Sequence, residues 1–298
     1  MQATATNTPL ATRPDPFAPA TLAADLLELR AVYAGFLAGL RPEDWAHRTG
    51  PRPKDWTVRE TVAHLDAALT AYHSAVVAAL AGQPVELPGA SRREDLSRWN
   101  RAEIDARAGL DVETLSTQLL DGMTRLAAIA GAMSPEESRR TTALPFFNAP
   151  MRACDMIGSQ LVHAGVVHAA QVVRGTGVEP LWRGLRQDTL QRILGHFFRV
   201  IGYVYWPERG GNLRATIAYL VGGPAGGDWR IEIGPAGGVG LAGPAEQADL
   251  TFRLRDADSA CRIFALDVAL PRALLGGQLR LSGDMGLAAR FPSLFTPT

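Results

Sequence analysis

Two histidines on separate segments are the residues whose type and spacing could do chemistry. His64 lies in the segment Trp56–Leu65, and His168 lies in the segment Gln160–Gln171. Both segments have helical patterns, and helical bundles build metal sites from side chains that face one another across the core. If both helices belong to one bundle, two imidazoles from distant parts of the chain can meet and bind a cation.

Small residues surround both histidines. Residues three or four apart are neighbours on a helix, so Ala67 lies beside His64, while Ala164 and Gly165 lie beside His168. Glycine inside a helix costs about 1 kcal/mol relative to alanine. Either close helix packing or space for a ligand should offset that cost. Packing as ordinary core or boundary residues is the alternative for both histidines.

A third metal ligand is harder to identify. Catalytic zinc usually has three protein ligands and an open fourth position. His163 precedes His168 by five residues, about 140° around an ideal helix, so it points elsewhere unless a π-bulge turns it. Glu60 lies one turn before His64, but it also follows Thr57 by three residues, which is the pattern of a capping box.

Gln171 lies on the same predicted helix face as His168. Its side-chain amide is better suited to a hydrogen bond that orients water or a thiol than to binding a metal. Gln171 is therefore the candidate catalytic residue. Cys154 is three turns or more before His168, too far to join the site. The chain has no Gly-x-Ser-x-Gly, Cys-x-x-Cys or His-Glu-x-x-His motif.

The elements that must position these residues form two regions, and the fold class is α+β. Apolar residues at spacings of three and four predict helices over about 22–40, 58–80, 115–133 and 150–174, with a more polar helix near 92–107. Beyond about residue 183 one more helix, near 188–203, leads into segments with strand patterns separated by glycine turns. These are residues 213–221, 229–233, 239–241, 248–254 and 278–282, with short helices near 256–265, 270–275 and from 284. We expect a disordered tail over 1–19, a helical bundle over 20–180 and a smaller α+β domain over 187–298.

Composition excludes several classes of function. The 298 residues are 47% hydrophobic and 20% charged, which provides ample core for two domains. Basic and acidic residues balance at 30 each, so we expect no nucleic-acid or membrane partner. The chain has neither 18 uninterrupted apolar residues nor a signal peptide's apolar region. We therefore expect a cytoplasmic protein in which Cys154 and Cys261 are buried thiols.

Two stretches around the histidines resemble a known family. The first is Trp56-Thr57-Val58-Arg59-Glu60 with Ala63-His64-Leu65, and the second is His168-Ala169-Ala170-Gln171. Together they resemble the DinB-like bundles, especially the mycothiol-dependent maleylpyruvate isomerase branch, over roughly residues 20–180. The second half resembles a sterol-carrier-protein-like domain, on the stretches 248–252, 274–279 and 282–285.

The resemblance implies a four-helix bundle that binds a divalent metal, commonly zinc. The metal would activate mycothiol or a related thiol, because coordination lowers a thiol's pKa and yields the nucleophilic thiolate. His64 and His168 carry over as ligands. The family's remaining ligand falls on Ala164, which cannot coordinate. Either His163 substitutes through altered helix geometry, or the site binds metal weakly, or it has lost the metal.

Two hypotheses of function follow. The first is a metal- and thiol-dependent transferase or isomerase acting on a small electrophilic substrate, with His64, His168 and His163 as ligands and Gln171 orienting water or thiol. The second is a non-catalytic binder of a small apolar ligand with a degenerate metal site, which requires an apolar cleft between Val200–Trp206 and the sheet. Bundles of this type often dimerise, so a homodimer is also an expectation.

Overall fold

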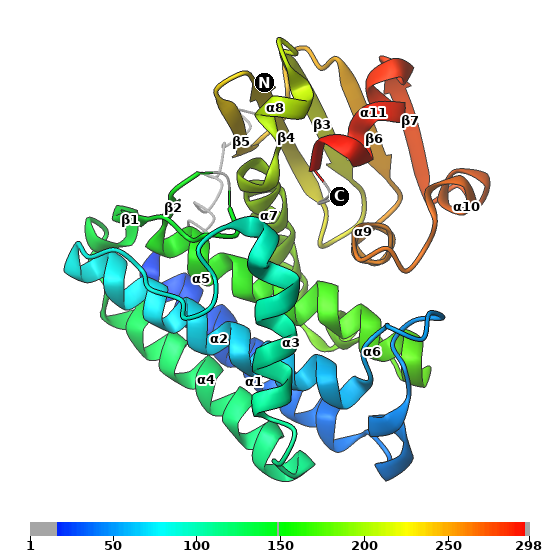
Figure 1. Ribbon diagram of the computed structural model, residues 1–298. Helices are drawn as coiled ribbons and strands as arrows, with labels where there is room; N and C mark the ends of the chain where they lie inside the picture. Colours follow the sequence, from blue (N-terminus) through cyan, green and yellow to red (C-terminus); the bar gives the residue numbers. More distant parts are fainter. Residues whose placement is uncertain (1–16, 148, 296–298) are drawn as a thin grey trace, which may run out of the picture.

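The computed structural model describes residues 17–147 and 149–295, which form a helical bundle and an α+β domain (Figure 1). The bundle packs α1 against α4 and α5, and α2 against α3, α4 and α5. Its helices are α1 (Pro19–Ala38), α2 (Val58–Ala81), α3 (Leu96–Ala106), α4 (Val112–Ala132), α5 (Ala153–Val162) and α6 (Ala169–Thr176). A π-helix, His163–His168, joins α5 to α6 without a break. Short elements η1 (Pro42–Ala46), η2 (Arg93–Asp95), η3 (Glu137–Arg139), β1 (Thr141–Thr142) and β2 (Met151–Arg152) lie between them.

The start of α2 is fixed by the capping box that the sequence predicts. The Thr57 hydroxyl accepts a hydrogen bond from the Glu60 backbone N–H (3.1 Å), and the Glu60 carboxylate accepts one from the Thr57 N–H (2.8 Å). Glu60 also pairs with Arg101 of α3 at 2.9 Å. The carboxylate of Glu60 therefore serves the helix terminus, which removes it as a metal ligand. The cap also fixes where His64 lies along the helix.

The second domain is a five-stranded sheet with helices on one face. The strand order is β5-β4-β3-β6-β7, in which β3 and β6 are parallel and the other pairs antiparallel. The strands are β3 (Ala215–Val221), β4 (Gly227–Gly234), β5 (Gly237–Ala242), β6 (Leu250–Leu254) and β7 (Leu279–Gly283). The helices are α7 (Gln187–Val204), α8 (Pro207–Gly210), α9 (Ala257–Phe264), α10 (Leu270–Leu275) and α11 (Met285–Phe295), and η5 (Leu181–Gly184) precedes them.

An aromatic layer attaches α7, α9 and α11 to the sheet. Tyr219 of β3 is in register with Trp229 and Phe252 on the neighbouring strands, so the three rings lie on one face. The ring centroids of Phe198 in α7 and Tyr219 are 4.5 Å apart, and those of Phe291 in α11 and Phe252 are 5.1 Å apart. These rings define the face of the sheet that looks toward the bundle.

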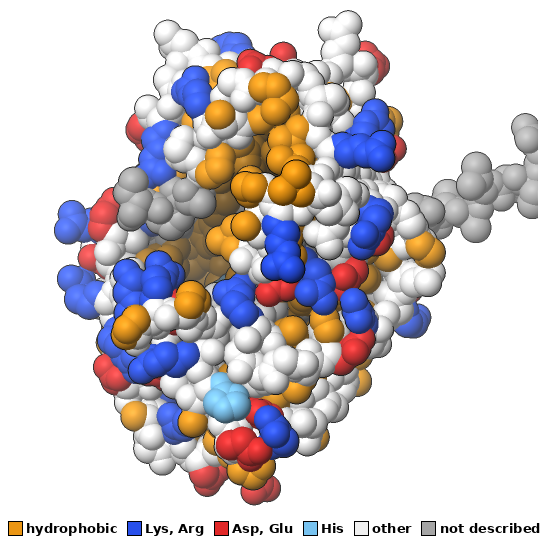
Figure 2. Space-filling view, turned by 90° about the vertical axis from the view of Figure 1, so that its right-hand side faces the viewer, with side chains coloured by type: hydrophobic (Ala, Val, Ile, Leu, Met, Phe, Trp, Pro, Cys, Tyr) orange, Lys and Arg blue, Asp and Glu red, His pale blue; other side chains and the backbone are white. Residues whose placement is uncertain are grey.

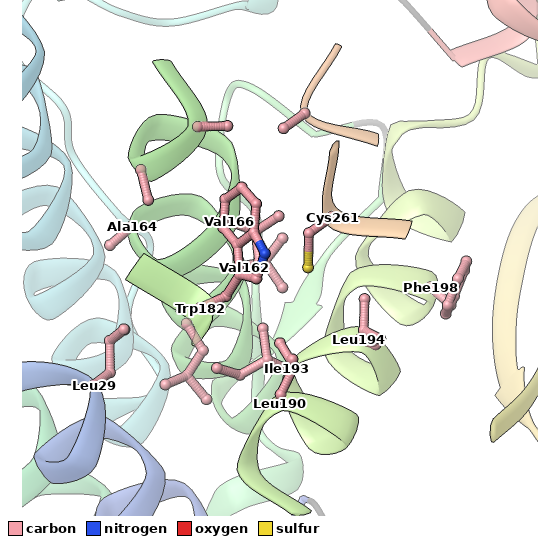
Figure 3. Packing of buried hydrophobic residues seen from close by; sticks show 14 of the residues in the cluster. Leu29, Val162, Ala164, Val166, Trp182, Leu190, Ile193, Leu194, Phe198 and Cys261 are labelled. Atoms are coloured by element: carbon pink, nitrogen blue, oxygen red, sulfur yellow. The ribbon is translucent and has the colours of Figure 1, made fainter. Parts of the chain in front are cut away.

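Trp182, in the segment between the two regions, packs where they meet. Its indole is almost fully buried and donates a hydrogen bond to Asp258 of α9 at 3.0 Å. Figure 3 shows side chains of the bundle, α7 and α9 gathered around this ring, including Val166, Ile193 and Cys261. The bundle and the α+β domain therefore share one continuous hydrophobic core.

Several expectations about the chain's termini and thiols can be compared with this structure. Cys154 and Cys261 are buried and free, as predicted. Most of the predicted tail, residues 1–16, lies outside the described residues, and its last residue, Pro19, already begins α1.

One described helical run, Ala153–Thr176, has the length and apolarity of a membrane span, but 78% of its most apolar window is buried inside the protein. That burial is typical of a core helix.

Glycines allow α7 to lie directly on β5. A Cβ on Gly240 would overlap the Phe198 carbonyl oxygen and lie 2.5 Å from the Arg199 Cα. The obstacle is backbone on both sides, which cannot move aside as a side-chain tip can. Gly35 of α1 offers a contrast, because a Cβ there would meet nothing within 4 Å.

We expect Gly240→Ala to lower the free energy of unfolding by about 1–3 kcal/mol, because the added methyl forces α7 away from β5. The control Gly35→Ala should raise it by up to about 1 kcal/mol, since alanine is the better helix former. Urea unfolding followed by circular dichroism measures both. Equal stability of the Gly240→Ala variant and the parent would contradict this close packing.

Candidate metal centre

Three histidines bring their Nε2 atoms together in the bundle. The Nε2 atoms of His64 and His163 are 3.3 Å apart, and those of His163 and His168 are 2.9 Å apart. One nitrogen from each ring lies within 4.8 Å of the other two. His64 comes from α2 and the other two from the π-helix, so two distant segments of the chain build the cluster. Among the residues that the structure describes, it is the single such group of potential metal ligands.

The π-helix explains how His163 and His168 share one face. On an α-helix residues five apart diverge by about 140°, but a π-helix bonds residue i to residue i+5 and brings them into line. His163 and His168 are the first and last residues of the π-helix. The structure therefore contains the π turn that was the condition for His163 to face the same way as His168. The altered helix geometry brings the His163 ring into the cluster, and the neighbouring Ala164 has no donor atom to contribute.

Gly165 serves packing rather than ligand space. A Cβ at this position would lie 3.1 Å from Leu29 Cδ1 of α1, so glycine allows α1 to approach the π-helix closely. Ala164 is buried as well. Cys154 lies outside the cluster and makes its own contact with Asp155. The small residues beside His168 thus bring the bundle helices together around the π turn.

Gln171 fixes the orientation of His168. Its side-chain oxygen lies 2.8 Å from His168 Nδ1. An amide oxygen only accepts hydrogen bonds, so Nδ1 carries the proton and Nε2 presents its lone pair to the cluster. The Nδ1 atoms of His64 and His163 are buried without a hydrogen-bond partner among the described residues. Gln171 therefore acts on the cluster through His168.

Burial keeps all three rings neutral. Desolvation lowers the pKa values of His64 and His163 well below the ordinary value, and the neighbouring imidazoles and, for His64, Arg107 lower them further. Desolvation also lowers the pKa of His168 to about 4, against the opposing hydrogen bond to Gln171. Trp56 packs over the cluster, with its ring centroid 4.7 Å from that of His64 and 6.1 Å from that of His168. Neutral imidazoles are the form that a metal requires.

The donor set fits a tetrahedral metal such as zinc. Nitrogens about 2.0–2.1 Å from a tetrahedral ion lie about 3.3–3.4 Å from each other. The His64–His163 separation of 3.3 Å matches, and the His163–His168 separation of 2.9 Å is a few tenths shorter. Three neutral nitrogen donors are the ligand set of a catalytic zinc site with a fourth position left open.

A large apolar pocket reaches the cluster at His163. Its volume is about 650 Å³, and it lies between the bundle and the α+β domain. One wall is a stripe on α7, made by Phe197, Val200, Ile201 and Val204. Figure 2 shows hydrophobic side chains on the walls of a hollow on this side of the molecule. The apolar cleft that the binder hypothesis requires is therefore present, beside the histidines.

Three residues at this site received no functional role from the sequence. Trp56 belongs to the motif around His64, and its ring covers those of His64 and His168. Tyr72 reads as a core position in the α2 stripe, and Ser159 carries no motif, yet both line the pocket with His163. Their helical spacing is a usable signal, because Tyr72 lies eight residues after His64 and Ser159 lies four residues before His163.

Known structures share this architecture. The crystal structure of a mycothiol-dependent maleylpyruvate isomerase superposes with a TM-score of 0.51 at 13% sequence identity, covering 83% of this chain and 88% of that chain. A histidine-to-alanine mutant of that isomerase matches with the same values. At this identity the likeness concerns the fold. No curated protein sequence matches the chain.

A family model also matches the bundle. The model of the mycothiol maleylpyruvate isomerase N-terminal domain covers residues 7–172, which is more than half of the chain. These residues include all three histidines and Gln171, and they confirm the resemblance seen in the two helical motifs. The chain belongs to the mycothiol maleylpyruvate isomerase N-terminal domain family.

Proposed function

We propose that the protein is a metal-dependent and thiol-dependent transferase or isomerase that acts on a small electrophilic substrate. The observation that carries the proposal is the convergence of three Nε2 atoms from α2 and the π-helix. His168 presents its Nε2 lone pair to the cluster, and three imidazole nitrogens held this close together are the donor set of a bound ion. His64, His163 and His168 would hold zinc.

The residues around the cluster have separate tasks in this proposal. Gln171 holds His168 in the tautomer whose Nε2 can bind metal. Trp56 covers the rings of His64 and His168 and limits the access of water on its side. His163 borders the apolar pocket, which makes that pocket the route for the electrophile. A bound zinc would lower the pKa of a thiol and so supply a thiolate at neutral pH.

Mycothiol is the thiol we propose, and a similar low-molecular-weight thiol is the alternative. The family model and the isomerase of similar fold both carry mycothiol in their names. Localisation in the cytoplasm, where such thiols are reduced, is part of the same proposal.

A second candidate function is non-catalytic binding of a small apolar ligand. The large apolar pocket beside α7 favours it, since that pocket needs no metal to hold a ligand. The two candidates differ in one property: only the enzyme requires a tightly bound ion at the histidines.

We expect protein purified without an affinity tag or added metal to contain close to one equivalent of zinc. Chelation should lower the melting temperature, and zinc should restore it, because an ion at 100 times its Kd stabilises the folded state by about 2.7 kcal/mol. Elemental analysis and thermal melts measure the two quantities. A metal-free protein whose melting temperature ignores zinc would contradict the enzyme and favour the binder.

Single substitutions should separate ligands from the orienting residue. His163→Ala should abolish stoichiometric zinc binding, whereas Gln171→Ala should weaken zinc affinity by about 10- to 100-fold, because His168 loses its fixed tautomer. His73→Ala is the matched control, since His73 lies on α2 outside the cluster. Competition titrations with a chromogenic chelator give the affinities. Zinc affinity unchanged in His163→Ala would exclude His163 as a ligand.

The stability of the chelator-treated protein should depend on pH through the buried rings. The folded-state pKa of His168, about 4, lies below the ordinary value of 6.5, so the unfolded state binds more protons between these values. The free energy of unfolding should therefore fall as the pH drops from about 6.5 toward about 4. Urea unfolding at several pH values tests this, and His168→Leu should flatten the dependence. A parent protein equally stable across that interval would contradict burial of neutral histidines.

A further inference from the structure

A second pocket adjoins the histidine cluster through Trp56 and Gln171. Both residues line this pocket, and both contact the cluster, since the Trp56 ring covers those of His64 and His168 and Gln171 binds His168 Nδ1. Its volume of about 640 Å³ lies in the range of small-molecule sites. None of the three histidines lines it. A ligand in this pocket would therefore lie one side chain away from the cluster.

This second pocket, which we call the cationic pocket, differs in charge from the apolar pocket at His163. Arg52, Lys54 and Arg174 line it together with one acid, Asp55. Both carboxylate oxygens of Asp55 accept hydrogen bonds from Arg52, so this acid is already paired. The lining of the apolar pocket includes no Asp, Glu, Lys or Arg. The two pockets thus suit ligands of opposite polarity.

The cationic pocket has hydrogen-bond donors that the protein does not use. The Lys54 ammonium group forms no hydrogen bond and no ion pair with the described residues. Arg174 donates through Nη1 to the Thr49 carbonyl oxygen at 3.4 Å and through Nη2 to that of Ala265 at 3.3 Å. Each Nη atom carries two N–H groups, so one on each has no protein partner. Such donors bind acceptor oxygens of carboxylates, amides or hydroxyls.

Leu266 marks the boundary between the two pockets. It is the one residue that lines both of them. Its φ of 57° lies in the left-handed region, which is uncommon for a residue with a side chain, and the residue is 78% exposed. Arg174 holds the chain on either side of it, at the Ala265 carbonyl oxygen and at the Asp267 carboxylate. Strained residues of this kind persist where neighbouring contacts hold them, and they cluster at ligand sites.

We propose that the cationic pocket binds the hydrophilic body of the thiol, whose oxygens accept hydrogen bonds from Lys54 and Arg174. A reaction between a thiol and an electrophile needs room for both beside the histidines at the same time. The apolar pocket takes the electrophile at His163, and the thiol reaches the cluster from the cationic pocket past Leu266. This inference rests on the proposed function, because it assigns a binding site to the thiol of the same reaction.

Lys54 gives the inference a direct test, because it is the single lysine of the chain. The protein is treated with N-hydroxysuccinimidyl acetate, and mass spectrometry compares acetylation of Lys54 with that of the N-terminal α-amine. The probes are thioethers, which do not consume the reagent: S-methylmycothiol, N-acetyl-S-methylcysteine and butyl methyl sulfide. We expect an acceptor-rich probe at saturation to slow Lys54 acetylation at least about five-fold, because the ammonium group is engaged by the ligand. Butyl methyl sulfide should leave the rate unchanged.

The two acceptor-rich probes distinguish the possible sources of the oxygens. Protection by S-methylmycothiol would identify hydroxyl and amide oxygens, and protection by N-acetyl-S-methylcysteine alone would identify a carboxylate. Either result supports a hydrophilic thiol in the cationic pocket. Lack of protection by both probes, or equal protection by butyl methyl sulfide, would overturn the inference.

Two variants with matched controls test the assignment by affinity, measured by isothermal titration calorimetry. Lys54→Met should weaken the protecting probe by about two- to ten-fold, because a hydrogen bond is lost. Arg272→Met, at an exposed position outside both pockets, should not weaken it. Ser97→Trp should abolish binding by filling the cationic pocket, whereas Ser74→Trp, exposed on α2, should leave it intact. Equal losses in Lys54→Met and Arg272→Met would exclude Lys54 as a donor to the thiol.

Measurements on chelator-treated and zinc-loaded protein separate this inference from the proposed function. The thioether probes carry no thiolate, so their binding in the cationic pocket does not require zinc. Protection of Lys54 in a protein that never binds zinc would leave the ligand class of this pocket standing and remove the thiol chemistry. Zinc binding without protection of Lys54 would remove the thiol's binding site alone.

Discussion

The π turn between α5 and α6 is the constraint on which the site depends. It places His163 and His168 on the same face of the helix, the face that looks toward His64, although an ideal helix would separate them. Such a turn gives up regular α-helical hydrogen bonding, and single π turns occur frequently at functional sites. Here it brings a third histidine into the cluster beside Ala164, whose side chain has no donor atom. The position of His163 thus depends on the backbone geometry of this turn.

Tertiary contacts hold this turn in place. Leu29 of α1 packs against Gly165, in the middle of the π-helix, where an added Cβ would lie 3.1 Å from Leu29 Cδ1. Gly158, on α5 before the π-helix, packs against the His196 ring of α7, because a Cβ there would overlap that ring. The π-helix is therefore supported from α1, and the helix that precedes it from α7. Because α7 also lies on β5, the sheet supports the same region indirectly.

Local sequence patterns predict much of this molecule, for identifiable reasons. The capping box of Thr57 and Glu60 marks the start of α2, and the glycine turns separate strands whose order the pattern does not give. His64 and His168 can be recognised from their small neighbours. His163 cannot, because its direction depends on contacts such as Leu29 with Gly165 that lie far apart in the sequence.

The sequence places an apolar cleft beside Val200–Trp206, but it does not give the cleft's other walls, for a related reason. Its walls come from α2, α5, α7, α9 and α11, so its shape depends on how the domains dock. The domains dock through their shared hydrophobic core and through polar contacts: Trp182 with Asp258, and Arg192 with Asp25 at 2.6 Å. Helical periodicity marks Tyr72 as inward-facing but does not distinguish a core position from a pocket wall.

The placement of charge around the histidines bears on which ligand the site favours. The nearby carboxylates are already paired: Glu60 with Arg101, Asp66 with Arg107 at 2.7 Å, and Asp155 with Arg152 and Arg199. No carboxylate joins the three neutral imidazoles among the described residues. A divalent cation held there would keep its full charge in apolar surroundings, where charge is costly unless it is compensated. An anionic fourth ligand such as a thiolate would provide part of that compensation. Because these carboxylates are already paired, compensation of a cation at the histidines would fall to a bound anion.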